Sequence, residues 1–262
     1  MNTNRSKVDN RETSARATTV PMTRRAIIDK NRVQKLGVHT DPEQLLLALI
    51  LTHGIITKAT WEAIGGYAKE ELSNAMWALT RRKLVVARSL FPGTTYFMLS
   101  QFAASSLELP LSRAKAIEGD GRVRAFARLL FFTQYFPLAV RESKDNVSTQ
   151  LGQSIDGLPL GFFTHTDRPE WLGFLRIDGH MMTVPMRSAR SLRDDVLRLV
   201  TLEHIRVMLK QKRFEWFWVT ARQSRADAVM TLFKTFDVGK APVTMVAMSE
   251  LLPLIPSKER RT

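Results

Sequence analysis

The stretch ALTRRKLVVARSLFPGTTYFMLS, residues 78–100, is the part of the chain whose pattern says most about the fold. It opens with the basic end of a helical pattern and continues with two runs of β-prone side chains, 84–88 and 95–99. Between these runs, Pro92 and Gly93 form a dipeptide that is typical of a turn. The stretch therefore predicts a helix followed by a two-stranded hairpin.

Three helical patterns lead up to this hairpin. Asp41 can cap the first helix, Pro42 can occupy its first turn, and Gly54 can end it. A second, short helix is predicted over 58–64 and a third over 68–83. Apolar residues of the third helix recur at a spacing that makes one buried stripe, and they are Leu72, Ala75, Met76 and Leu79.

This order of elements resembles the winged helix-turn-helix family over residues 41–106. The resemblance implies that the helix 68–82 enters the major groove of DNA and that the hairpin lies along the adjacent backbone. The side chains on or beside the base-reading face would be Lys69, Ser73, Asn74 and Trp77. The side chains expected to contact phosphates are Thr80, Arg81, Arg82, Lys83 and Arg88. The alternative for each is an ordinary solvated helix face, and winged helices also serve as protein-protein modules.

The charge of the chain favours a polyanionic partner. Among 262 residues there are 39 Lys and Arg against 25 Asp and Glu, which gives a formal net charge of +14. Basic side chains neutralise phosphates and release condensed counterions, so nucleic acid is the expected partner class. A merely basic enzyme is the alternative.

Other features of the composition exclude several classes of protein. The chain has no cysteine, which excludes disulfides and thiolate metal sites and fits a cytoplasmic location. The longest nearly apolar run, 45–51, is far shorter than the roughly 20 residues that span a bilayer, so no membrane partner is expected. The first residues lack the apolar segment of a secretory signal.

The two ends of the chain are basic and polar. Residues 1–37 contain nine basic and three acidic residues, and few apolar ones. We interpret this segment as a disordered basic arm, in which Arg24 and Arg25 would contact DNA along the backbone or in a minor groove. A passive tail that aids solubility is the alternative. Residues 257–262 are interpreted as a short basic tail.

The remaining sequence predicts a helical connector over 107–149 and a small α/β domain with a mixed sheet over 150–256, so that the whole chain is of the α+β class. Strands are expected at 171–177, 214–219 and 243–247. Asp178-Gly179 predicts a hairpin turn with a returning strand over 180–184. Helices are expected from Ser191 to Lys212 and from Ser224 to Phe236.

A winged helix joined to such a domain looks like the replication-relaxation proteins of plasmids and integrative elements. The similarity rests on the elements around LRIDGHMMTVP (175–185), RSLRDDVLRLV (190–200) and FEWFWVTARQSRADAVMTLF (214–233). In that family the second domain is similar to the restriction-endonuclease-like fold, here in a degenerate form. A catalytically active nuclease of this fold needs an Asp and a Glu-x-Lys motif around Mg²⁺. Asp178 is suitably placed, but Glu142-Ser143-Lys144 precedes it and lies in a polar segment.

Other candidate constellations are weaker. His165, Asp167 and His180 lack a recognisable metal-ligand spacing, and no nucleotide-binding glycine loop occurs, so neither a metal nor a cofactor is predicted. Aromatic residues at 214–218 can stack on unpaired bases, although adjacent aromatics in a strand usually belong to a core.

The sequence therefore predicts a sequence-specific duplex-DNA-binding protein of a plasmid, phage or integrative element. It would act in transcription control, replication or conjugative transfer, and would not be an enzyme. The domain 150–256 is expected to form a homodimer or to bind another protein of a replication or transfer complex. A Mg²⁺-dependent nuclease or relaxase is the alternative, and a protein-interaction scaffold is a third reading.

Overall fold

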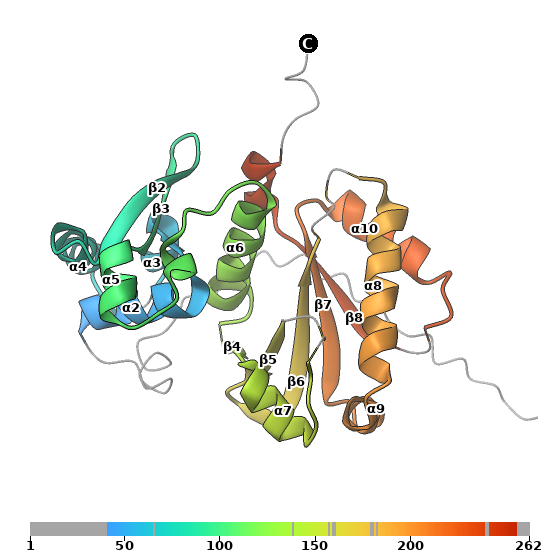
Figure 1. Ribbon diagram of the computed structural model, residues 1–262. Helices are drawn as coiled ribbons and strands as arrows, with labels where there is room; N and C mark the ends of the chain where they lie inside the picture. The colour runs from blue at the N-terminus through green and yellow to red at the C-terminus, as the bar shows by residue number, and fades with distance from the viewer. Residues whose placement is uncertain are drawn as a thin grey trace, which may run out of the picture.

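The computed structural model is drawn in Figure 1. The residues that it describes are 41–64, 66–137, 139–156, 158, 161–178, 181, 183–238 and 241–255. The predicted arm with Arg24 and Arg25, and the basic tail 257–262, lie outside this described part. Among the described residues, no helix combines the length and the apolarity that crossing a bilayer requires.

The N-terminal unit contains three helices and three strands. They are α2 (Pro42–His53), β1 (Ile56–Thr57), α3 (Lys58–Trp61), α4 (Lys69–Arg81), β2 (Val85–Phe91) and β3 (Thr94–Leu99). The strands form an antiparallel sheet in the order β1-β3-β2. As predicted, the Asp41 side chain caps α2 by accepting a hydrogen bond from the Glu43 backbone N–H, and Gly54 ends this helix with a φ of 85°.

The apolar stripe of α4 is confirmed. Leu72, Ala75, Met76 and Leu79 are all buried, and they belong to one cluster with Leu45, Leu46 and Ile50 of α2. The remaining faces of α4 are left largely to solvent. The packing of one stripe therefore decides which residues of α4 are available to a partner.

The local boundaries differ from the predicted ones at two places. The α-helical part of α3 ends at Trp61 rather than at residue 64. The hairpin is tighter than expected, because β2 extends to Phe91 and β3 begins at Thr94, so that Pro92 and Gly93 alone form the turn. Gly93 has a φ of 81°, which a residue with a Cβ rarely adopts.

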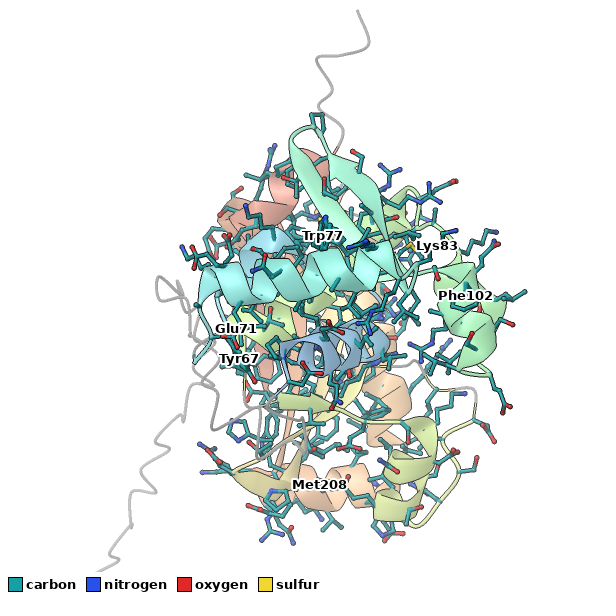
Figure 2. All side chains as sticks on the ribbon, turned by 90° about the vertical axis from the view of Figure 1, so that its left-hand side faces the viewer. Tyr67, Glu71, Trp77, Lys83, Phe102 and Met208 are labelled. Carbon is teal, nitrogen blue, oxygen red and sulfur yellow. The ribbon has the colours of Figure 1, made fainter. Side chains whose placement is uncertain are left out.

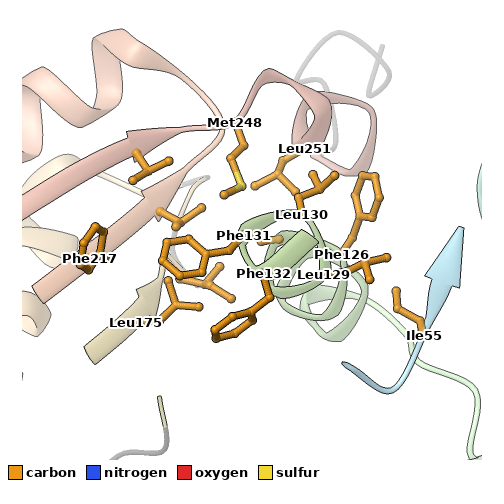
Figure 3. Packing of buried hydrophobic residues seen from close by; sticks show 14 of the residues in the cluster. Ile55, Phe126, Leu129, Leu130, Phe131, Phe132, Leu175, Phe217, Met248 and Leu251 are labelled. Atoms are coloured by element: carbon orange, nitrogen blue, oxygen red, sulfur yellow. The ribbon is translucent and has the colours of Figure 1, made fainter. Parts of the chain in front are cut away.

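Four further segments connect the hairpin to the second sheet. They are α5 (Gln101–Ser106), the 3₁₀-helix η1 (Leu111–Ala114), α6 (Asp120–Leu130) and the π-helical turn η2 (Phe131–Tyr135). Three of these segments, η1, α6 and η2, fall within the predicted helical connector, and α6 begins directly after Gly119. Figure 3 shows the side chains of α6 and η2 packed between Ile55 of the N-terminal unit and Leu175, Phe217 and Met248 of the second unit.

The second sheet has five strands and is mixed, as the sequence predicts. Its order is β4 (Ala139–Arg141), β5 (Phe162–His165), β6 (Arg168–Ile177), β7 (Phe214–Thr220) and β8 (Val243–Ala247). The pairs among β4, β5 and β6 are antiparallel, and those among β6, β7 and β8 are parallel. The prediction that 107–149 is a purely helical connector is therefore wrong, because β4 pairs with β5 and belongs to this sheet.

Five helical segments complete this second unit. They are α7 (Lys144–Leu151), α8 (Pro185–Val200), α9 (Glu203–Lys210), α10 (Gln223–Phe233) and the 3₁₀-helix η3 (Ser249–Leu254). In Figure 1, α8 and α10 lie on one side of the sheet and α6 on the other. Two core clusters match these sides, one with α8 and α10 and one with α6, η2 and η3.

The hairpin predicted at Asp178-Gly179 is wrong. β6 has β5 on one side and β7 on the other, so no place beside it remains for a strand returning from residue 180. The Asp178 backbone N–H instead donates to the carbonyl of Val219 in β7, which continues the parallel ladder. Parallel strands need a crossover connection, and α8 and α9 supply it.

The two predicted helices of this unit have different limits. α8 begins at Pro185, so Ser191 lies inside the helix instead of capping it, and a break at Thr201 and Leu202 separates α8 from α9. The last helix is preceded by Arg222 rather than by Ser224. Pro185 suits a first helical turn because its missing N–H has no partner there in any case.

The strand expected at 214–219 is confirmed as hydrophobic on both faces. Phe217 and Val219 belong to the cluster on the α6 side, and Trp216 and Trp218 to the cluster on the α8 side. Phe214, Trp216, Phe217 and Trp218 are all at most 3% exposed. The interpretation of these aromatics as core residues is therefore correct, and they are not available for stacking on bases.

Candidate nucleic-acid interface

The exposed side of α4 contains most of the predicted contact residues. Figure 2 looks onto this side, with α4 running across the view below the β2–β3 hairpin. Lys69, Asn74, Trp77, Thr80 and Arg81 are exposed, whereas Ser73 is half-buried. These positions follow from the buried stripe, because Leu72, Ala75, Met76 and Leu79 pack against the core and leave the other faces of α4 to solvent.

A groove lies between α4, α3 and the hairpin. It has a volume of about 790 Å³. From α4 it is lined by Ser73, Met76, Trp77 and Thr80; from α3 and its cap by Thr57, Lys58, Ala59, Trp61 and Glu62; and from the hairpin by Gly93, Thr94, Thr95 and Phe97. The structure thus brings Ser73, Trp77 and Thr80 together at the groove, but it leaves Lys69 and Asn74 outside its lining.

Trp77 is the most exposed large aromatic side chain in the N-terminal unit. Its exposed fraction is 63%, and the guanidinium carbon of Arg81 lies 5.3 Å from the centre of its ring. This spacing is that of a cation-π contact, which holds the two flat groups together on the helix surface. A planar aromatic group and a planar cation are therefore presented side by side next to the groove.

The three basic residues at the end of α4 do not form one cluster of free charges. The Arg82 guanidinium pairs with the carboxylate of Glu43 on α2. Lys83 has a φ of 59°, and its backbone carbonyl accepts a hydrogen bond from the Ser100 hydroxyl, so its backbone forms the turn into β2. Arg81 and Lys83 are exposed, whereas the Arg82 guanidinium is already paired with Glu43 of α2.

Arg88 is the single charged residue of the hairpin sequence 85–99. It is exposed and stands opposite Tyr96 in the antiparallel pair of β2 and β3. At the other end of α4, Glu70 and Glu71 are exposed in the first turn, where a negative charge stabilises the helix dipole. Positive charge is therefore concentrated at the C-terminal end of α4 and on the hairpin.

Asp178, the residue of the nuclease alternative, is buried and already has polar partners. Its carboxylate lies 2.6 Å from Nε of Arg225, and it accepts a hydrogen bond from the Ser188 hydroxyl at 2.8 Å. Arg225 also donates to the backbone carbonyl of Thr183. This network ties the end of β6 to α8 and α10.

The other acidic and histidine candidates are dispersed. Glu142 accepts hydrogen bonds from Thr164 and Asn146, and Lys144 lies 3.8 Å from Asp156. Nδ1 of His165 accepts a hydrogen bond from the backbone N–H of Asp167 within a local turn. His180 lies outside the described residues. Within the described part of the chain, no three His, Asp or Glu residues are grouped so that they could hold a metal ion.

The structure also brings together an arginine group that the sequence did not reveal. Arg124 and Arg128 of α6, Arg141 of β4 and Arg176 of β6 line one cavity. The available signal was the spacing of Arg124 and Arg128 on the polar face of a predicted helix. Arg141 and Arg176 join them only through the tertiary fold.

Comparison of the chain with models of protein families, with curated proteins and with solved structures gives no match. The function is therefore inferred from the geometry and charge of the described residues.

Proposed function

We propose that residues 41–99 form a winged helix that binds duplex DNA, with α4 as the recognition helix and the β2–β3 hairpin as the wing. The observation that supports this most is the placement of α4: one stripe is buried, and its exposed side flanks a groove with the hairpin. The succession of a helix, a strand, two helices and a two-stranded hairpin agrees with this assignment. The formal charge of +14 gives the electrostatic attraction.

The geometry divides the proposed contacts into two groups. Asn74, Ser73 and Lys69 are the candidates for base edges, with Trp77 and Thr80 beside them. Arg81, Lys83 and Arg88 are the candidates for phosphates. Arg82 would have to leave Glu43 before it could contact a phosphate, so we assign it a smaller share of the binding energy.

The wider role proposed for the protein is regulation of transcription, replication or DNA transfer on a plasmid, phage or integrative element, in the cytoplasm. A nuclease or relaxase has less support. Asp178 is already neutralised by Arg225, and burial together with this ion pair leaves it poorly suited to bind Mg²⁺.

A second copy of the chain is the proposed partner on DNA, because one winged helix reads only a short half-site. The sequence predicts that the domain 150–256 supplies the dimer surface, because its strand 214–219 and helix 191–212 are rich in apolar residues. The structure uses most of those apolar residues within the monomer core. The larger exposed apolar group lies on α5 and η1, where Phe102, Leu107 and Leu111 are 62%, 50% and 62% exposed. We therefore place the proposed dimer surface there.

The DNA proposal is tested by measuring affinity for a random-sequence duplex at several salt concentrations. Replacing Arg81 and Lys83 together by Gln should weaken binding and reduce the slope of log K against log[salt] by about 2, since two phosphate contacts are lost. The matched control is Arg206→Gln with Lys210→Gln, two exposed residues of α9 with the same change in charge. Equal losses of DNA affinity in the two double variants would mean that binding depends only on the net charge of the protein and does not take place at α4.

A further inference from the structure

A cavity of about 270 Å³ lies where α6 meets the sheet, beside β6 and α8. Its basic lining residues are Arg124, Arg128, Arg141 and Arg176, and its acidic ones are Asp120 and Asp178. The basic side chains come from three different elements, so the fold itself gathers them.

Two of these charges are already neutralised by partners. Nε of Arg176 lies 3.2 Å from the carboxylate of Asp195, and the same guanidinium donates to Ser191. Asp178 is paired with Arg225. Their charges are thus balanced inside the protein and leave no excess in the cavity.

Among the described residues, the guanidinium groups of the other three lining arginines have no acidic partner. Within the described part of the chain, the guanidinium groups of Arg124, Arg128 and Arg141 form neither an ion pair nor a hydrogen bond. Since Asp178 is paired with Arg225, the lining carboxylate left to balance these three positive charges is that of Asp120, which is exposed to solvent. Arg124 is exposed, whereas Arg128 and Arg141 are half-buried. Charges that are removed from solvent are normally paired, so the two half-buried guanidinium groups call for an anion.

The protonation behaviour of the group agrees with that reading. Burial, together with the charges of Arg141 and Arg124, lowers the pKa of Arg128 to about 10. Burial also lowers the pKa of Arg141, with a contribution from Arg113. Like charges therefore lie close enough to repel one another, and an anion between them would relieve this repulsion.

We propose that this cavity binds the phosphate group of a small anionic ligand. Guanidinium groups present planar forks of N–H donors that match phosphate oxygens, and three arginines whose guanidinium groups pair with no described residue line this cavity. The volume of about 270 Å³ accommodates a phosphate or pyrophosphate group and is below the usual range for larger ligands. Backbone phosphates of duplex DNA are the less favoured source, because the proposed DNA-binding side of α4 faces away from the sheet (Figures 1 and 2).

Such a ligand would act on the junction between the two halves of the protein. α6 contributes two of the unpaired arginines, while its apolar residues pack against both the N-terminal unit and the sheet. A bound phosphate would connect α6 with β4 through Arg128 and Arg141. The ligand therefore stabilises the folded chain, and this effect does not depend on whether α4 binds DNA.

The experiment measures the binding of inorganic phosphate and of pyrophosphate to the full chain by calorimetry, together with thermal unfolding at constant ionic strength. The variants are Arg128→Gln and Arg141→Gln, and the control is Arg206→Gln on α9, which lies outside the cavity lining. Each cavity variant should bind pyrophosphate roughly 10- to 100-fold more weakly, the loss expected for a hydrogen bond to a charged group. The control should bind as the wild type does.

The unfolding temperatures without ligand give an independent check. Arg128→Gln should unfold at the same temperature as the wild type or higher, because it removes an unpaired, half-buried charge, and yet it should lose the rise in unfolding temperature that pyrophosphate causes. Arg141→Gln, at the sheet edge, provides the same comparison if Arg128→Gln does not fold. Equal responses of wild type, cavity variants and control to pyrophosphate would overturn the proposal. It would also be overturned if pyrophosphate did not bind and the cavity variants instead weakened duplex DNA binding, which would assign the arginines to DNA.

Discussion

At the scale of single residues, His53 illustrates how burial and neighbouring charge act together. It is the last residue of α2, its ring stacks against Phe132 with centroids 5.8 Å apart, and its Nδ1 has no hydrogen-bond partner. Burial, together with the charges of Arg141 and Arg128, lowers its pKa to about 4. The imidazole is therefore neutral at physiological pH.

This shift predicts a pH dependence of stability. The unfolded chain binds a proton at His53 near pH 6.5, whereas the folded protein binds it only near pH 4. Because the folded pKa is the lower one, stability is lost as the pH falls through this window, by on the order of 3 kcal/mol. His53→Phe should remove this part of the pH dependence. The measurement is the free energy of unfolding in urea for the wild type and the variant, from neutral pH down to about pH 4. The same pH dependence in both proteins would contradict the lowered pKa of His53.

Asn74 gives a prediction about base reading on the proposed recognition helix. It is exposed and lies outside the groove lining. Asn74→Ala should reduce the preference for one base at a single position of the DNA site by roughly 1–3 kcal/mol. The double change Arg81→Ala with Arg82→Ala should weaken binding to all DNA sequences about equally. Selection from a random duplex pool, repeated with each variant, distinguishes the two effects. If Asn74→Ala weakened binding to all DNA sequences equally, another residue would have to contact the bases.

At the scale of elements, local and nonlocal features differ in how far the sequence predicts them. The buried stripe of α4 and the hairpin of β2 and β3 depend on neighbouring residues, and both are found as expected. The Asp178-Gly179 signal is also local, but β7 occupies the place that the returning strand would need. The short strands β4 and β5 owe their existence to pairing within the sheet, which periodicity over three or four residues cannot reveal.

The same distinction applies to the candidate sites. The exposed side of α4 follows from helical spacing, so Lys69, Asn74, Trp77 and Arg81 could be placed on the surface from the sequence. The pairing of Arg82 with Glu43 joins two helices, and the arginine cavity joins α6 with two strands. Contacts of this kind depend on tertiary packing, which no single segment encodes.

The contact between β5 and β6 gives a prediction at the same scale. Gly173 of β6 stands opposite Phe163, and a Cβ at this position would lie 2.4 Å from the Phe163 ring. Gly173→Ala should therefore destabilise the fold by about 1–3 kcal/mol, the usual cost of overpacking a core. Gly121→Ala is the matched control, because a Cβ there meets nothing within 4 Å in the first turn of α6. It should be neutral or stabilising by up to about 1 kcal/mol in denaturant unfolding.

At the scale of the whole molecule, the core around α6 connects the two halves. Ile55, Leu90 and Tyr96 of the N-terminal unit share a cluster with Phe131 of η2 and Phe217 of the second sheet. A fragment that begins at residue 107 would expose the side of this cluster that the N-terminal unit covers. Experiments on assembly should therefore use the full chain.

Two surfaces can be compared as the site of the proposed dimer. The first is the apolar group Phe102, Leu107 and Leu111 on α5 and η1. The second, in the region expected from the sequence, is Leu197 of α8 with Val207 of α9, which are 42% and 43% exposed. Exposed apolar residues that are grouped together mark interaction surfaces more often than isolated ones do. The first surface has three such residues, all of them more exposed.

The dimer prediction is that Phe102→Ser with Leu111→Ser converts the full-length protein to a monomer, as measured by light scattering. Both side chains are largely exposed, so the folded monomer loses little packing. The variant should also bind a palindromic site far more weakly than the wild type, while its affinity for a single half-site stays unchanged. Leu197→Ser with Val207→Ser should leave the dimer intact. If this second variant is the one that becomes monomeric, the dimer surface lies on α8 and α9. A wild-type protein that is monomeric both with and without palindromic DNA would rule out the dimer itself.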